Sequence, residues 1–154
     1  MMKYALRIAA AAIVLGSPLM SSGALSQVNP GNIKWGPAPP GLPRGAQAAV
    51  LAGNPERPGL FTLRLRFPPG YSVAPHTHPA AEHVTVISGQ LSLGMGPRVQ
   101  PRRMATLVMG GFANAPARMA HYVTTRSGAV IQITSQGPFA INYVNPADDP
   151  RRHR

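Results

Sequence analysis

The sequence of 154 residues contains no cysteine and only four acidic residues. The absence of cysteine excludes disulfide bonds, so stability must come from an apolar core, with a bound metal as a second source. Carboxylate chemistry is confined to Glu56, Glu82, Asp148 and Asp149. General acid–base catalysis would therefore fall to Glu82, to histidine or to metal-bound water, and this scarcity disfavours a hydrolase.

The few acidic residues leave 15 lysines and arginines largely unbalanced, and the formal net charge is +11. Such a charge is typical of nucleic-acid-binding proteins, but most of the arginines are scattered along the chain. Only Arg102-Arg103 and the segment 151–154 form clusters. We therefore predict a solvated basic surface suited to anionic envelope lipids, and no nucleic-acid partner. An anionic substrate steered by this charge is an open alternative.

The sequence also lacks an apolar run of the roughly 20 residues that cross a bilayer. Near its start, Lys3 and Arg7 are followed by the short apolar run 8–15, and small residues at 24–26 offer a cleavage position. This layout predicts that residues 1–26 are a secretory signal peptide. The mature protein would then be periplasmic or secreted, without a stable membrane span. The alternative is an uncleaved N-terminal anchor.

Proline and glycine interrupt residues 27–45 too often for a helix or a long strand. We predict an extended arm across the outside of a β-barrel domain, which spans residues 46–145. Trp35 would pin the arm to the core surface, with ligand binding as its alternative role. Residues 146–154 form a predicted basic C-terminal tail that frays at its end.

Short strands separated by turns, with no helix, fill the region between arm and tail, which predicts an all-β fold. The clearest strand is Leu60 to Phe67, where apolar and polar residues alternate. Ser88-Gly89 is interpreted as a tight turn between two strands. The other strands are predicted at residues 46–51, 82–87, 90–95, 104–109, 122–126, 129–134 and 139–143.

The segment Gly70 to Gly89 contains the largest group of candidate metal ligands in the chain. His76 and His78 stand two residues apart, so in a strand both point to one face. Pro79 interrupts the strand, and a turn there would bring Glu82 back on a neighbouring strand. Two imidazole nitrogens and one carboxylate oxygen suit a divalent transition metal. His83 alternates with Glu82 and points away from it.

This spacing, G-x5-H-x-H-x3-E-x6-G, resembles the first motif of the cupin superfamily at every specified position. Residues 110–125 resemble the second motif, with Gly110, Pro116 and His121 in register. They depart from it at Arg118, where the family has glycine, and at Thr125, where it has asparagine. Glycine there would serve a turn of unusual φ, so we expect Arg118 to cost about 1 kcal/mol. Its side chain would be exposed or lean over the pocket mouth.

The resemblance covers roughly residues 60–143 and implies a single-domain cupin jelly-roll barrel. With residues 35–40 and 137–146, the chain looks like a group of uncharacterised exported single-domain cupins. The resemblance also implies a homodimer joined through sheet edges. The implied metal ligands are His76, His78, Glu82 and His121.

Such a ligand set suits Fe, Mn, Ni, Cu or Zn as one divalent ion, and leaves positions open for water, dioxygen or substrate. The first hypothesis is therefore an oxygenase-like enzyme acting on a small molecule. The second is a non-catalytic module whose metal is structural or senses a ligand, and the third is a metal-free interaction protein. Core packing is favoured for six further apolar residues, which are also candidates for an apolar pocket wall: Met95, Met104, Met109, Phe112, Met119 and Tyr122.

Overall fold

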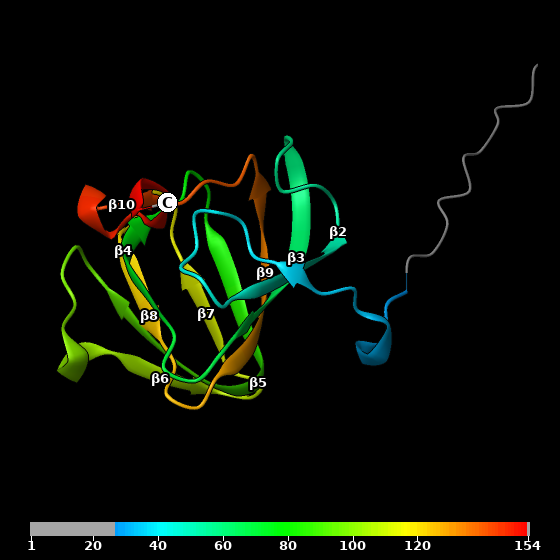
Figure 1. Cartoon of the computed structure of the whole chain (residues 1–154), viewed down its shortest axis with the longest axis horizontal. Helices are drawn as coiled ribbons and strands as arrows, with labels where there is room; N and C mark the ends of the chain where they lie inside the picture. Colours follow the sequence, from blue (N-terminus) through cyan, green and yellow to red (C-terminus); the bar gives the residue numbers. More distant parts are fainter. Residues whose placement is uncertain (1–26, 154) are drawn as a thin grey trace, which may run out of the picture.

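The computed structural model describes residues 27–153, and the predicted signal peptide lies outside them. This part of the chain contains no α-helix, as predicted, and folds into strands joined by turns and four short 3-10 turns (Figure 1). No helix among the described residues is long and apolar enough to cross a membrane. The strands are β1 Gly36–Pro37, β2 Gln47–Ala52, β3 Gly59–Phe67, β4 Ser72–Thr77, β5 Glu82–Met95, β6 Ala105–Val108, β7 Phe112–Ala115, β8 His121–Thr124, β9 Ala129–Gly137 and β10 Asn142–Tyr143.

The strands form one curled antiparallel sheet in the order β1-β2-β3-β9-β5-β8-β4-β10, with β6 and β7 both paired to β5. Strand β5 joins the two walls of this curled sheet. Its first half lies between β9 and β7, and its second half lies between β8 and β6. The result is the predicted all-β barrel, in which the side chains of both walls face a shared interior.

The predicted turn at Ser88-Gly89 is wrong, because β5 runs through it as a single strand of 14 residues. The pairing with β9 shifts register between Val86 and Ser88, and Gly89 adopts a φ of 74°. A side chain at Gly89 would collide with the backbone of Gly128, which lies in the turn just before β9. Glycine thus allows a bulge that bends the strand from one wall into the other, where a turn would have reversed it.

The core forms where the predicted alternation of β3 meets the apolar residues of β9 and β5. Phe61, Leu63, Leu65 and Phe67 are all at most 5% exposed, while Thr62, Arg64 and Arg66 face outward or lie at the edge. Each fully buried side chain of this kind contributes roughly 1.5–3 kcal/mol. This apolar set lines the inside of the barrel and surrounds the buried polar groups described below.

The arm does more than lie across the outside, and that part of the prediction is wrong. Trp35 is pinned to the barrel as expected, since the Arg66 guanidinium lies 4.1 Å from the centre of its ring. Leu42, however, is 8% exposed and belongs to the core cluster. The Pro-rich composition gave no periodicity from which this insertion could be inferred.

In the second half of the chain one strand was not predicted and another is shorter than predicted. Strand β7 was not predicted, because its sequence Phe-Ala-Asn-Ala has little of the β-branched character of strands. The predicted strand 139–143 shortens to Asn142–Tyr143. In the tail, residues 146–148 and 150–153 wind into 3-10 turns. The Arg151 guanidinium there donates hydrogen bonds to Asp149 and to the carbonyl of Ile141.

Gly94 is a position where any side chain is expected to be costly. It pairs with Tyr122 across β5 and β8, and an added Cβ would collide with the Tyr122 ring. That ring is 2% exposed, and its hydroxyl accepts a hydrogen bond from the Gln100 N–H. We expect Gly94→Ala to lower the free energy of unfolding by about 2–3 kcal/mol in urea titrations, because the strand interior becomes overpacked. Gly36→Ala, where an added Cβ meets no atom within 4 Å, is the control. Equal stability of the two variants would contradict this packing.

Candidate metal centre

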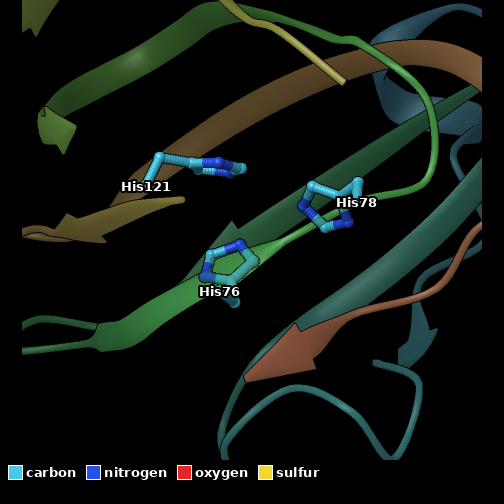
Figure 2. A group of neighbouring side chains, drawn as sticks. All are labelled: His76, His78 and His121. Atoms are coloured by element: carbon cyan, nitrogen blue, oxygen red, sulfur yellow. The ribbon is translucent and has the colours of Figure 1, made fainter. Parts of the chain in front are cut away.

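Three histidines converge inside the barrel from two adjacent strands. His76 lies on β4 directly opposite His121 on β8, and His78 follows the end of β4 on the same face as His76. Figure 2 shows the three rings grouped around a common space. One nitrogen from each ring lies within 4.8 Å of the others, and the residues are 2–5% exposed. The structure therefore brings together three of the four residues that the motifs named, His76 and His78 from one segment and His121 from another.

Each ring is oriented by its other nitrogen, which contacts a backbone carbonyl. The Nδ1 atoms lie 2.7 Å from Ala74 O for His76, 2.7 Å from Ala140 O for His78 and 3.1 Å from Met119 O for His121. Carbonyl oxygens only accept, so these contacts place the proton of each neutral ring on Nδ1. The Nε2 atoms are then left with a free lone pair, which is the form that binds a metal.

In the neutral rings the Nε2 atoms of His78 and His121 are buried acceptors that no donor faces. Their nearest polar neighbours are the carboxylate oxygens of Glu82, which are acceptors as well. Buried polar atoms in proteins are nearly always satisfied, and an unmatched acceptor costs about 1–3 kcal/mol. Two such atoms facing one space indicate that something else satisfies them. A divalent transition metal fits both the donor type and the arrangement. The residues present therefore suit the ion that the sequence motif implies.

The fourth predicted residue, Glu82, lies against the same cluster. It begins β5, is 6% exposed, and places its two carboxylate oxygens 3.7 Å from His78 Nε2 and 3.3 Å from His121 Nε2. His83 is exposed on the opposite face, as predicted. The four side chains thus come together, and their role as ligands remains the prediction made from the motif.

The electrostatics of the cluster keep two rings neutral and the carboxylate charged. Burial lowers the pKa of His76 to about 4, and His121 adds to this effect. Burial also lowers the pKa of His78. Burial alone would raise the pKa of Glu82, but the neighbouring His121, His78 and His76 outweigh it and lower the pKa. For His121, burial is outweighed by Glu82, which raises the pKa.

The space enclosed by these groups is a cavity of about 40 Å³. A site of that size holds an ion and a water but not a larger molecule. Apolar side chains form the rest of its wall, among them Leu42 from the arm and Phe139, whose ring stacks on His78 at 4.4 Å. No pattern in the sequence predicted that Leu42 would line this cavity. Phe139 carried a signal, because it alternates with Ile141 and Tyr143 in the predicted strand 139–143.

The pocket wall proposed from the sequence is wrong, since none of its six members lines this cavity. Met95, Met109, Met119 and Phe112 are exposed, so the favoured prediction of core packing is wrong for them too. Met104 is partly buried, and Tyr122 is buried where it covers Gly94. The error follows from choosing residues by type near the motif, because several of them fall in turns or on outward faces.

The backbone of Arg118 has the unusual φ that was expected at this position of the second motif. Its φ is 61°, and it is the only residue other than glycine with a positive φ in the described chain. Its side chain is exposed, which was the first of the two predicted positions. Its backbone N–H donates a 2.8 Å hydrogen bond to the carbonyl of His78. The strained turn therefore supports the candidate ligand His78 through the backbone.

Replacing Arg118 by glycine is expected to stabilise the protein by about 0.5–1 kcal/mol, because glycine adopts positive φ without a Cβ clash. The hydrogen bond to His78 would remain, since it comes from the backbone. Thermal unfolding checks this, with Arg118→Ala as the control that removes the side chain and keeps the strain. A variant with glycine that melts below the alanine variant would contradict the prediction.

A family model described as "Domain of unknown function (DUF4437)" matches residues 20–142. No curated protein matches the sequence. The polyketide cyclase RemF from Streptomyces resistomycificus aligns with a TM-score of 0.67 at 17% identity, over 84% of this chain and 92% of that chain. A putative acetylacetone dioxygenase from Methylibium petroleiphilum gives 0.63 at 21% identity, over 86% and 89%.

A third solved structure, an RmlC-like cupin from Shewanella frigidimarina, has a TM-score of 0.55 at 16% identity, over 71% of this chain and 87% of that chain. At such identities the likeness concerns the fold alone. It confirms the cupin fold and the jelly-roll barrel that the two motifs predicted.

Proposed function

The chain belongs to the family of proteins described as Domain of unknown function (DUF4437), and from this premise and the cupin fold we propose that it is an exported metal-dependent enzyme acting on a small molecule, with oxygenase-like chemistry. The observation that carries the proposal is the pair of unsatisfied Nε2 atoms, on His78 and His121, beside a buried carboxylate. A barrel that needed only stability would fill this space with apolar side chains.

In this proposal some side chains bind the ion, and neighbouring backbone groups hold those side chains in position. His76, His78 and His121 would hold the ion through Nε2, with Glu82 as the fourth ligand. Bound there, the ion would supply Lewis-acid or redox chemistry, and Fe, Mn, Ni, Cu and Zn all suit the donors. Three backbone carbonyls fix the rings, so the donor atoms are already oriented before an ion arrives. If loading follows export, the relative affinities favour copper or zinc over iron.

The enzymatic part of the proposal is supported by the structural relatives that carry the same barrel. Two of them are described as a polyketide cyclase and a putative acetylacetone dioxygenase. Fold alone does not decide function, so this support is by analogy. Among the described residues that line the metal cavity, Glu82 is the only carboxylate. Proton transfer would therefore rest on Glu82 or on water at the ion.

Oxygen consumption by the metal-loaded protein tests the oxygenase reading. We expect turnover with at least one member of a panel of β-diketones and phenols, and none with the metal-free protein. Five separate preparations, each loaded with one of the five metals, are assayed. They distinguish inactivity caused by an unsuitable metal from inactivity caused by an unsuitable substrate. Absence of oxygen uptake across all five preparations and the whole panel would contradict the proposal.

A non-catalytic cupin with a structural or sensing metal is the second candidate, and the small cavity favours it. About 40 Å³ beside the histidines leaves no room for a substrate without movement of the wall. This candidate predicts that a chelator lowers the melting temperature strongly, and that His121→Ala does the same, while no reaction is found with any substrate. Turnover that depends on the metal would rule it out.

Export is proposed from residues 1–26 alone, which lie outside the described structure. We expect the protein expressed with its own leader to accumulate in the periplasm and to begin at residue 27. N-terminal sequencing of the fractionated protein measures this directly. A cytoplasmic protein that retains residues 1–26 would contradict export without affecting the metal site.

A further inference from the structure

A second cavity lies on the far side of one wall of the metal cavity. It has a volume of about 340 Å³, within the range of small-molecule sites. The two cavities share four wall residues, Leu42, Leu65, Phe139 and Ile141, so a single layer of apolar side chains separates them. We call the larger one the outer pocket. Its remaining lining includes the arm residues 39–41 and Ala140.

Phe139 in this layer and Ala140 beside it contact the predicted ligand His78 directly. Phe139 stacks on His78 at 4.4 Å with an interplanar angle of 17°, and Ala140 O accepts the hydrogen bond from the Nδ1–H of His78. The same short segment therefore lines the outer pocket and orients a predicted ligand. A molecule in the outer pocket would lie one side chain away from the Nε2 cluster.

Leu42 is the member of this layer that comes from the arm, whereas Leu65 lies on β3, and Phe139 and Ile141 lie in the segment between β9 and β10. The residues on either side of it are held by two tyrosine hydroxyls, which donate to Gly41 O from Tyr143 at 2.8 Å and to Pro43 O from Tyr71 at 2.7 Å. The arm is thus fastened at two points that bracket the inserted leucine. A side chain held in this way can change its rotamer without release of the arm.

The chemistry of the outer pocket selects an uncharged ligand. Its walls are mainly proline, leucine, isoleucine and phenylalanine. The charged residues that border it are Glu56, which is exposed, and Arg151, whose guanidinium is already paired with Asp149 and the Ile141 carbonyl. Among the residues that line this pocket, Arg151 is the one cation, and its charge is already paired with Asp149, despite the high net charge of the chain.

We propose that the outer pocket binds the apolar, uncharged body of the substrate, and that Leu42 is the gate through which the reactive end reaches the metal cavity. The proposed role of Leu42 as a gate depends on the proposed metal-dependent function. The proposed binding of an apolar ligand in the outer pocket is independent of that function, because the arm and barrel alone form the pocket. The two parts are therefore tested separately.

Titration with the neutral fluorescent dye N-phenyl-1-naphthylamine tests the pocket, in metal-free and metal-loaded protein. We expect binding in both forms, weakened at least about tenfold by Ala140→Trp, which fills the pocket. The matched control is Val108→Trp, on an exposed position of β6 that lines neither cavity. If Ala140→Trp fails to fold, Gly41→Leu serves instead, since an added Cβ there meets only ordinary contacts. No dye binding to either form, or equal binding to the filled and control variants, would overturn the pocket.

The rate at which a chelator removes the metal tests the gate. Leu42→Ala joins the two cavities, so we expect removal to be at least about tenfold faster than in the wild type. Leu91→Ala is the matched control, because Leu91 lines the metal cavity but not the outer pocket. If Leu91→Ala does not fold, Val73→Ala replaces it for the same reason. Equal acceleration by Leu42→Ala and its control would overturn the gate, even if dye binding succeeds. A wild-type protein that holds no metal would overturn the gate together with the metal site, whereas a protein that holds metal without turnover would overturn the enzymatic function alone.

Discussion

The double variant His76→Ala/His78→Ala is expected to lose its metal. It removes two of the three imidazoles that meet within 4.8 Å. Removing one group that merely supports a ligand costs about 10–100-fold in affinity, so losing two ligands is expected to abolish binding. We expect metal analysis to fall from about one ion per chain to below about a tenth, because a divalent site in a protein needs three or four donors.

The matched control for this experiment is His83→Ala. His83 belongs to the same segment but is exposed and points away from the cluster, so its removal is expected to leave the metal content unchanged. Circular dichroism of both variants establishes that they are folded. A folded double variant that keeps about one ion per chain, or a His83 variant that loses it, would place the metal elsewhere.

Metal-free protein is expected to lose stability as the pH falls below 6.5, and His76 is expected to contribute about 3 kcal/mol of that loss. Burial lowers the pKa of His76 from its ordinary 6.5 to about 4. The unfolded chain therefore binds the His76 proton at a higher pH than the folded protein does, which favours unfolding. The contribution is fully present above pH 6.5 and is lost progressively down to about pH 4, at about 1.4 kcal/mol per pH unit.

His76→Gln isolates this effect from the other groups in the cluster. Glutamine does not titrate, so the variant is expected to gain about 3 kcal/mol relative to the wild type between pH 6.5 and 4. The comparison is needed because Glu82 pushes the pKa of His121 upward, and that ring contributes with the opposite sign. Urea unfolding at closely spaced pH values measures both proteins after treatment with a chelator. Parallel pH profiles would contradict the buried, neutral state of His76.

Much of the site could be predicted from the sequence because short-range geometry determines it. His76 and His78 alternate on one strand, so their shared direction follows from the two-residue period of a strand. The distance to His121 follows from the register of β4 with β8, which no local pattern encodes. That pairing could be anticipated only through the second cupin motif. The positive φ of Arg118 was predicted in the same way.

The features that were missed depend on contacts between distant segments. The local sequence around Gly89 predicts a turn. Only the close approach of Gly89 to Gly128 makes it a bulge within β5. Leu42 lies in a Pro-rich arm without periodicity, and its burial depends on two tyrosine hydroxyls from other parts of the chain. Met109 and Phe112 are exposed because they lie around the turn between β6 and β7, whereas their residue types suggested a wall.

The most direct test of the account is a crystal structure of the purified, metal-loaded protein with anomalous scattering data. We predict one anomalous peak inside the barrel, about 2.0–2.2 Å from Nε2 of His76, His78 and His121 and from a carboxylate oxygen of Glu82. A peak bound to any other set of residues, or an empty barrel after equilibration with each of the five candidate metals, would contradict it.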